Sequence, residues 1–340
     1  MGKVVGFGEI MLRLNPEGYL RLKQASKFEV SYAGSEANVA VSLANYGMNS
    51  CFVTKVPNND IGVSAINSLR AMGVDTSKIV LGGDRLGIYF VEKGASQRPS
   101  KVIYDRKHSA ISEASKTDFD WNSIFDDCDW FFFSGITPAL GENVAEICLD
   151  ACKTAKRKGI TVSCDLNYRK NLWSREKARE TMTKLMEYVD VCIANEEDAG
   201  DVFGIWAEDS DITDGKLSRE GYKSVAKQLL ERFGLKKVAI TLRSSISAND
   251  NNWAGMLYDG NDYYFSRSYN IHIVDRVGGG DSFGGGLIYA ILNGYSSADA
   301  IEFAVAASCL KHTIEFDYNH VTVDEVKKLM SGDASGRVQR

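Results

Sequence analysis

The sequence lacks the features that mark membrane proteins, disulfide-rich secreted proteins and nucleic-acid-binding proteins. No apolar run reaches the roughly 18 residues that a bilayer-spanning helix needs. The net charge is −5 and the basic residues are dispersed, so we expect no attraction to nucleic acid. The seven cysteines are scattered without a Cys-x-x-Cys pair, there are only four histidines, and residues 1–9 show no signal-peptide pattern. We therefore expect a cytoplasmic protein with reduced core cysteines, no zinc site and no membrane partner.

Three common catalytic or nucleotide-binding motifs are also absent. No Gly-x-Gly-x-x-Gly follows the first predicted strand, which disfavours a nicotinamide-binding site. The chain has no Gly-x₄-Gly-Lys-Ser/Thr, so it is not a P-loop enzyme. It has no Gly-x-Ser-x-Gly either, which argues against an α/β hydrolase.

The most distinctive stretch is rich in glycine and contains a carboxylate. Residues 275–286 hold two glycine triplets, 278–280 and 284–286, with Asp281 between them. Backbone N–H groups at a glycine-rich helix start attract anions. A carboxylate beside such an anion cradle makes sense if it takes a proton from a hydroxyl that attacks a phosphate, so Asp281 is a candidate general base. A mobile loop or a closely packed glycine helix is the alternative.

Strand and helix patterns alternate along most of the chain. Strands are predicted at 3–7, 51–54, 130–135, 160–164, 190–194 and 238–242. Helices are predicted at 35–46, 60–72, 141–158, 174–188, 219–233, 281–293, 298–312 and 323–330, and residues 331–340 are expected to be a frayed tail. The alternation predicts an α/β fold with a doubly wound, mostly parallel sheet flanked by helices.

A second, smaller sheet is predicted outside this alternation. The runs 87–92 and 101–106 have the composition of a β-hairpin. Residues 10–32 are polar and irregular, except that 28–32 alternates like a half-exposed strand. Together these segments predict a small β-sheet apart from the main one.

Polar residues follow two predicted strands at the edge where open α/β sheets bind ligands. Residues 165–170 follow one strand, and Asn195 to Asp198 follow the next. Asn195 and Asp198 are three apart, which would place them on one helix face, where they could hold a hydrated Mg²⁺. An acidic helix start is the alternative.

Other candidate ligand contacts lie near helix starts and on the small sheet. Gly34 precedes a helix that Ser35 could cap, and this junction could bind a small polar ligand or be a plain loop. Arg106 and Arg169 could bind a substrate carboxylate, although any single arginine is more commonly a surface residue. The polar segment 243–252 could contact a nucleotide.

Two motifs together give the chain a family resemblance over nearly its whole length. Asp275-Arg276-Val277-Gly278-Gly279-Gly280-Asp281 resembles the C-terminal signature of the ribokinase-like carbohydrate kinases, the PfkB family. Ala33-Gly34-Ser35-Glu36-Ala37-Asn38 and the later Gly47 resemble its N-terminal signature. With Tyr104-Asp105-Arg106 and Asp165-Leu166-Asn167-Tyr168-Arg169, the combination looks most similar to the 2-keto-3-deoxygluconate kinases.

The resemblance implies a kinase domain over residues 1–330 that transfers phosphate from ATP to the terminal (C6) hydroxyl of a keto sugar acid. Asp281 would be the base, and the N–H groups of Gly278, Gly279 and Gly280 would hold the transferred group. The implied sugar-acid contacts are Gly34, Ser35, Asn38, Tyr89, Tyr104, Arg106, Arg169 and Asp317. The implied nucleotide contacts are Asn167, Asn195, Thr241, Arg243, Ser244, Gly278 and Gly280, and the implied Mg²⁺ residues are Asn195 and Asp198.

The small sheet, from about 10–32 and 87–108, would be a lid that excludes water and joins subunits of a homo-oligomer. Glycines 284–286 would let their helix pack closely. The family's glycine-containing nucleotide loop is replaced here by Arg243 to Ser247. The family resemblance implies a monovalent-cation site around Asp275, but Arg276 stands where the family has a small residue, and this difference counts against such a site. A fructokinase-type or ribokinase-type kinase of a neutral sugar and a non-catalytic sugar-binding regulator are the alternatives.

Overall fold

The computed structural model describes residues 2–195, 197–207 and 218–332. Its largest element is a nine-stranded sheet with the order β14-β13-β12-β11-β10-β9-β1-β4, with β15 paired to β13. Its strands are β1 (Lys3–Phe7), β4 (Asn49–Val53), β9 (Cys128–Ser134), β10 (Thr161–Asp165), β11 (Val191–Ala194), β12 (Lys237–Ser245), β13 (Asp250–Tyr258), β14 (Tyr263–Phe265) and β15 (Tyr269–His272). Strands β4 to β12 in this order are parallel, and β13, β14 and β15 add antiparallel pairs.

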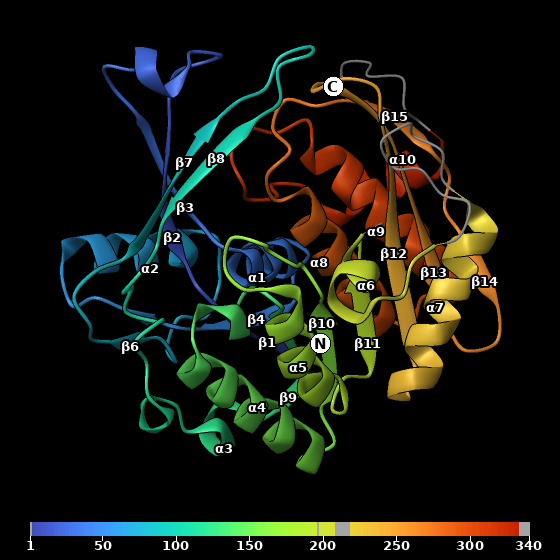
Figure 1. Cartoon of the computed structure of the whole chain (residues 1–340), viewed down its shortest axis with the longest axis horizontal. Coiled ribbons are helices and arrows are strands. Elements are labelled where there is room, and N and C mark those ends of the chain that lie inside the picture. Colours follow the sequence, from blue (N-terminus) through green and yellow to red (C-terminus); the bar gives the residue numbers. More distant parts are fainter. Residues whose placement is uncertain (1, 196, 208–217, 333–340) are drawn as a thin grey trace.

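Helices cover both faces of this sheet, which confirms the predicted doubly wound architecture (Figure 1). The helices are α1 (Ser35–Asn45), α2 (Asp60–Ala71), α3 (Trp121–Ile124), α4 (Glu142–Arg157), α5 (Arg175–Met186), α6 (Asp198–Phe203), α7 (Arg219–Phe233), α8 (Gly279–Leu292), α9 (Ser297–Lys311) and α10 (Val323–Met330). Short 3₁₀ helices lie at Leu22–Gln24, Lys116–Asp118 and Pro138–Leu140. Among the residues that the structure describes, no helix is long and apolar enough to cross a membrane.

Side chains of the central strands point alternately to the two faces of the sheet, and this divides the hydrophobic core into two layers. In β9, Phe131 and Phe133 pack with α3 to α7, whereas Trp130 and Phe132 pack with α1, α8, α9 and α10. Successive side chains of a strand point to opposite faces, so one apolar run supplies both layers. Six of the seven free cysteines are buried, as predicted for core residues.

A separate four-stranded sheet, which is the small sheet predicted to be a lid and is called the lid below, has the order β3-β2-β7-β8. Its strands are β2 (Met11–Asn15), β3 (Glu29–Ala33), β7 (Gly87–Glu92) and β8 (Lys101–Asp105), and it rises beside the main body in Figure 1. A further small sheet pairs β5 (Lys55–Val56) with β6 (Val80–Leu81). The predicted hairpin and the strand near 28–32 are confirmed.

Three predicted local structures are wrong. Residues 11–15 form strand β2 of the predicted small sheet, whereas only residues 28–32 of segment 10–32 were predicted to be a strand. Strand β12 continues to Ser245 and β13 begins at Asp250, so most of segment 243–252 is a hairpin of the main sheet. Helix α8 begins at Gly279, two positions before the predicted start. Of the predicted frayed tail, residues 333–340 lie outside the described residues.

Candidate active site

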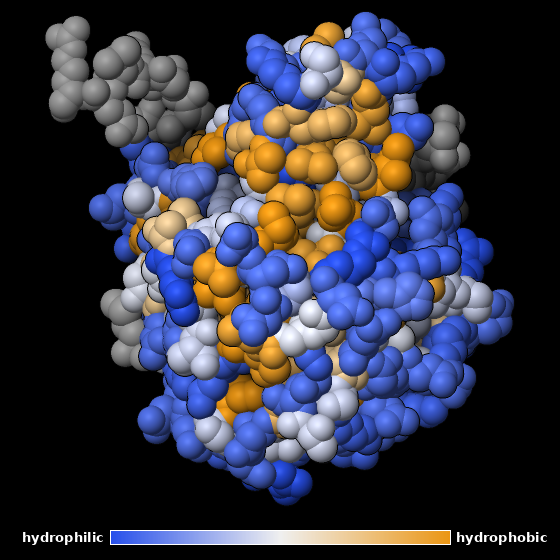
Figure 2. Space-filling view, turned by 90° about the vertical axis from the view of Figure 1, so that its left-hand side faces the viewer, coloured by the Kyte–Doolittle hydropathy of each residue, from blue (hydrophilic) through white to orange (hydrophobic). Residues whose placement is uncertain are grey.

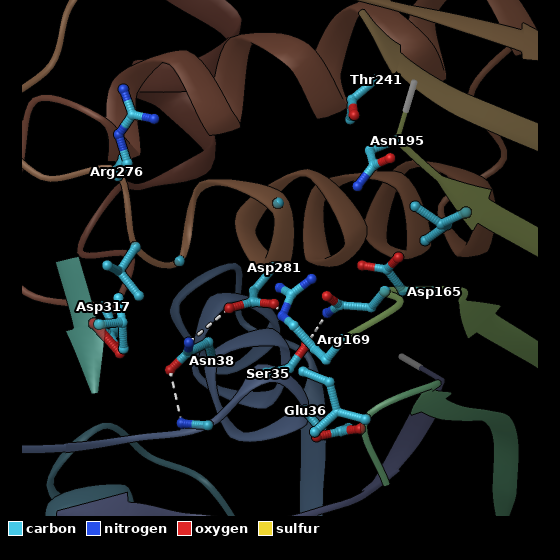
Figure 3. Close-up of a pocket in the computed structure, with 18 of the residues that line it drawn as sticks. Ser35, Glu36, Asn38, Asp165, Arg169, Asn195, Thr241, Arg276, Asp281 and Asp317 are labelled. Atoms are coloured by element: carbon cyan, nitrogen blue, oxygen red, sulfur yellow. Dashed lines mark hydrogen bonds between the residues drawn. The ribbon is translucent and has the colours of Figure 1, made fainter. Parts of the chain in front are cut away.

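A pocket of about 520 Å³ lies at the carboxyl ends of the parallel strands, bordered by the lid (Figure 3). This volume is in the range of small-molecule sites, and the position is the one where open α/β sheets bind ligands. The predicted site residues that line it are Gly34, Ser35, Asn38, Tyr89, Tyr104, Arg106, Asn167, Arg169, Asn195, Asp198, Thr241, Arg243, Gly278, Gly280, Asp281 and Asp317.

Two predicted site residues do not line the pocket. Ser244 follows Arg243 in β12, so its side chain points to the other face of the sheet. Gly279 is covered by His312, since a Cβ on Gly279 would lie 2.4 Å from the imidazole Cε1.

Asp281 is held by two side chains from the start of α1. The Ser35 hydroxyl donates to Oδ1 and the Asn38 amide donates to Oδ2, both at 2.7 Å (Figure 3). The predicted N-cap role of Ser35 is wrong, because Gly34 is the N-cap and has no side chain to accept from the helix. Burial raises the pKa of Asp281, and the two hydrogen bonds partly oppose that rise. The result is an oriented carboxylate that accepts a proton more readily than an exposed one.

Backbone N–H groups face the pocket at the start of α8. Gly278 is the N-cap with φ 86°, and a Cβ there would lie 2.2 Å from the Asp317 carbonyl oxygen, so only glycine fits. A Cβ on Gly280 would meet no atom within 4 Å. Within the described residues, the N–H groups of Gly278 and Gly280 find no acceptor. Free N–H groups at the positive end of a helix dipole are suited to bind an anion.

The second glycine triplet has a packing role at two of its three positions. A Cβ on Gly285 would lie 2.7 Å from the Ser42 Cβ, and one on Gly286 would lie 3.1 Å from the Ala304 Cα. At Gly284 the nearest atom, Ile193 Cδ1, would be 3.5 Å away, which is an ordinary contact.

A buried arginine that we did not predict joins the lid to the glycine loop. Arg13 of β2 is fully buried and forms ion pairs with Asp275, at 2.5 Å, and with Asp317. Tyr89 of β7 also donates to Asp317. Side chains in residues 11–15 alternate between buried and partly buried, and Arg13 lies on the buried face of the sheet. Its partners Asp275 and Asp317 are about 260 and 300 positions away in the sequence, so no local pattern indicated these ion pairs.

The two candidate carboxylate-binding arginines differ in availability. Arg106 is buried, and its Nε and Nη2 both donate to Glu9 Oε2, so its charge is already balanced. Arg169 is exposed, donates to the Tyr168 carbonyl at 3.0 Å and forms no ion pair with any described residue. In Figure 3 its guanidinium lies near Asp281, and its positive charge partly opposes the rise in pKa that burial causes at both Asp281 and Asp165. Arg169 is therefore the more available partner for a ligand anion.

Asn195 and Asp198 are reciprocal hydrogen-bond partners at the start of α6. The Asn195 side chain accepts from the Asp198 N–H at 2.9 Å, and Asp198 Oδ2 accepts from the Asn195 N–H at 3.0 Å. The predicted shared helix face is wrong, because Asn195 precedes the helix. Both still line the pocket.

Asp165, which we did not predict as a metal residue, also lines the pocket. Burial, followed by the negative charges of Asp198 and Asp281, raises its pKa well above the ordinary value. A divalent cation would relieve this repulsion, and Mg²⁺ favours one or two carboxylates together with water. These oxygen donors therefore fit Mg²⁺.

Two residues that the sequence did not single out, Trp253 and His312, also line the pocket. Arg276 lines it too, and so does Asn251 from the polar segment 243–252. Burial lowers the pKa of His312 to about 4, and its Nδ1 donates to the Ser308 carbonyl at 2.7 Å, so the imidazole is neutral. A lone histidine after a helix carries no recognisable motif, which explains why it was missed.

Comparisons with known proteins agree with this geometry. The sequence model described as pfkB family carbohydrate kinase matches residues 1–314. A 2-dehydro-3-deoxygalactonokinase from Haloferax volcanii is 31% identical over 98% of both chains. A solved 2-dehydro-3-deoxygluconokinase from Thermotoga maritima is 54% identical, with a TM-score of 0.94, over 98% of this chain and 100% of that one.

A more distant structure supports the fold class. A protein from E. coli described as a ribokinase II, solved with ATP and Mg²⁺, is 22% identical with a TM-score of 0.81, over 97% of this chain and 99% of that one. The predicted ribokinase-like fold is thereby confirmed. With a family match over nearly the whole chain and a pocket that joins an anion cradle to a carboxylate, the protein belongs to the pfkB family and is a carbohydrate kinase.

Proposed function

We propose that this kinase transfers the γ-phosphoryl group of ATP to the C6 hydroxyl of 2-keto-3-deoxygluconate, which is also named 2-dehydro-3-deoxygluconate. The observation that carries the proposal is that Arg169 is exposed in the same pocket as Asp281 and forms no ion pair with a described residue. An arginine matches a carboxylate in two-pronged fashion, so it suits a sugar acid more than a neutral sugar. The similarity to the Thermotoga maritima enzyme supports the same substrate.

In the proposed reaction, Asp281 takes the proton of the attacking hydroxyl. Ser35 and Asn38 hold both carboxylate oxygens, so the base is oriented before substrate arrives. The N–H groups of Gly278 and Gly280 stabilise the charge that develops on the transferred phosphoryl group. Proton acceptance and phosphate binding thus occur at adjacent positions of one helix start.

The two ends of the pocket have different roles. The nucleotide occupies the end around Asn195 and Thr241, and the sugar acid occupies the end around Asp317 (Figure 3). Arg243 and Gly34, which also line the pocket, contact the nucleotide and the sugar acid respectively. Tyr89, Tyr104 and Arg106 complete the sugar end from the lid, where the two tyrosine rings stack with centroids 6.0 Å apart. Asp165, Asn195 and Asp198 would hold Mg²⁺, which would neutralise charge on the ATP phosphates. We also infer that the enzyme is cytoplasmic, because the cytosol supplies ATP and keeps cysteines reduced, and the seven cysteines are free.

Replacement of Arg169 separates a sugar-acid kinase from the alternatives. For Arg169→Ala, kcat/KM on 2-keto-3-deoxygluconate should fall by about 100-fold or more, as expected for the loss of a charged hydrogen-bond pair. The neighbouring exposed Lys170→Ala is the matched control and should retain activity. A variant with unchanged kcat/KM, or a wild-type enzyme that prefers fructose or ribose, would favour a neutral-sugar kinase. An absence of ATP turnover with every sugar tested would favour a non-catalytic regulator.

We also propose that two copies of the chain associate through the lid. The outer lid face, defined as Leu14, Phe28, Val30, Phe90 and Ile103, consists of apolar side chains on one side of the sheet. Val30 is 58% exposed and Ile103 is 42% exposed, and Figure 2 shows apolar side chains gathered in this region. An exposed apolar sheet face of this kind suits a self-complementary contact with a second copy.

Light scattering after size exclusion tests this association. The wild type should be a dimer and Val30→Glu should be a monomer, because the new charge would be buried unpaired. Val63→Glu, which alters an exposed valine on α2, is the control and should remain a dimer. A monomeric wild type, or a dimeric Val30→Glu, would contradict the proposal.

A further inference from the structure

Lys311, the last residue of α9, has an environment that is unusual for a lysine. Its side chain is fully buried, which lysine rarely is without a charged partner. No carboxylate of a described residue lies within ion-pairing distance of it. Its ammonium instead donates to two main-chain carbonyls, those of Asp275 at 3.3 Å and Ile314 at 3.2 Å.

These two carbonyls belong to the two segments that adjoin the proposed phosphate cradle of Gly278 and Gly280. Residues 275–278 lead into the helix start, and residues 312–317 end at Asp317, whose carbonyl oxygen packs against Gly278. The segments are joined where Val274 N–H donates to the His312 carbonyl at 2.8 Å. Lys311 therefore links both segments directly behind the cradle.

Charge balance explains why an ammonium is retained there. Arg13 pairs with both Asp275 and Asp317, which leaves one negative charge in this buried cluster. The carboxylates of Asp275, Asp317 and Asp281 favour the protonated form of Lys311, whereas burial and Arg13 oppose it. The pKa is lowered to about 8, mainly by burial, so the side chain is charged at neutral pH. Lys311 completes the charge balance without an ion from solvent.

We propose that Lys311 is the built-in monovalent cation of the phosphate cradle, and that this kinase needs no added K⁺, Na⁺ or NH₄⁺. An ammonium bound by carbonyl oxygens has the charge and the ligands of a bound monovalent ion, but it is attached to the protein. Lys311 is thus a positioning residue, since it acts through the 275–278 and 312–317 segments and does not touch the reacting atoms. The inference rests on the proposed kinase function and concerns the same site.

The test compares the wild type with two variants in buffers that contain tetramethylammonium as the only added monovalent cation. Wild-type kcat should change by less than about twofold when K⁺ or NH₄⁺ is added, because the cation is already present. Lys311→Ala leaves the carbonyl oxygens and an empty volume, so kcat should fall by about 100-fold and recover at least about tenfold with K⁺ or NH₄⁺. Lys311→Met fills that volume without charge, so its lower kcat should not recover.

Lys327→Ala, at an exposed position on α10, is the control and should match the wild type under all conditions. Activation of the wild type by K⁺ of more than about fivefold, or full activity of Lys311→Met without cations, would overturn the inference. Melting temperatures show whether each variant is folded, and a folded Lys311→Ala that K⁺ and NH₄⁺ do not rescue would also overturn it. If the wild type phosphorylates a different sugar, the proposed substrate is wrong, but the same cation comparison on that sugar still decides the role of Lys311.

Discussion

Gly280→Ala should separate the stability of the enzyme from its activity. Gly280 lines the pocket at the second position of α8, and a methyl group there would meet no protein atom within 4 Å. The folded chain can accept this methyl, and replacing glycine by alanine in a helix stabilises it by up to about 1 kcal/mol. The melting temperature should therefore stay the same or rise slightly.

The same methyl should disable phosphoryl transfer. A phosphoryl oxygen must lie about 2.7–3.1 Å from the cradle N–H groups in the transition state, and the methyl would occupy that space. Loss of one such donor costs about 100- to 1,000-fold in kcat. Because the contact matters most in the transition state, kcat should fall more than the KM for ATP rises.

Gly284→Ala is the matched control on the same helix. Its Cβ would lie 3.5 Å from Ile193 and 3.7 Å from Val39, at ordinary contact distances. This variant should keep near-wild-type kcat in a coupled ATP-turnover assay. If Gly280→Ala is folded and fully active, or if both variants lose activity equally, the assignment of the cradle is wrong.

Three other perturbations test separate parts of the site. Ser35→Ala removes a hydrogen-bond donor that lowers the pKa of Asp281, so this pKa should rise further. The acidic limb of the kcat–pH profile should then move to higher pH, and an unmoved limb would contradict the role of Asp281 as base. Arg13→Met leaves the buried carboxylates of Asp275 and Asp317 without the guanidinium that they share, so the free energy of unfolding measured by urea denaturation should fall by about 3–5 kcal/mol. A fall of less than about 1 kcal/mol would contradict the importance of these ion pairs. EDTA should abolish turnover and Mg²⁺ should restore it, whereas turnover that survives chelation would exclude the proposed metal role.

Much of the fold could be predicted because it depends on local patterns. The apolar runs that form the central strands and the 3.6-residue periodicity of the main helices are visible in the sequence, and nearly all appear in the structure. The predicted ends of strands differ from the observed ones where the hydrophobic pattern of the sequence is weak. Strand β2 was missed because its flanks are polar, and strand β12 was cut short where polar residues begin.

The site could be predicted only in part, because side-chain partners depend on contacts between distant residues. The glycine cradle and Asp281 lie in one continuous segment, so their proximity was evident. Ser35 looked like a helix cap, and only the packing of α1 against α8 shows that its hydroxyl serves Asp281. The burial of Lys311 was equally hidden, since a lysine at a helix C-terminus is ordinarily exposed and favoured by the helix dipole.

The most direct test of the central claim is to identify the product formed from ATP, Mg²⁺ and 2-keto-3-deoxygluconate. Phosphorus-31 NMR coupled to proton assignments would locate the new phosphate ester. We predict ADP and a single monoester on C6, formed with a higher kcat/KM than for fructose or ribose. Phosphate on another carbon, or turnover restricted to neutral sugars, would contradict the proposed function.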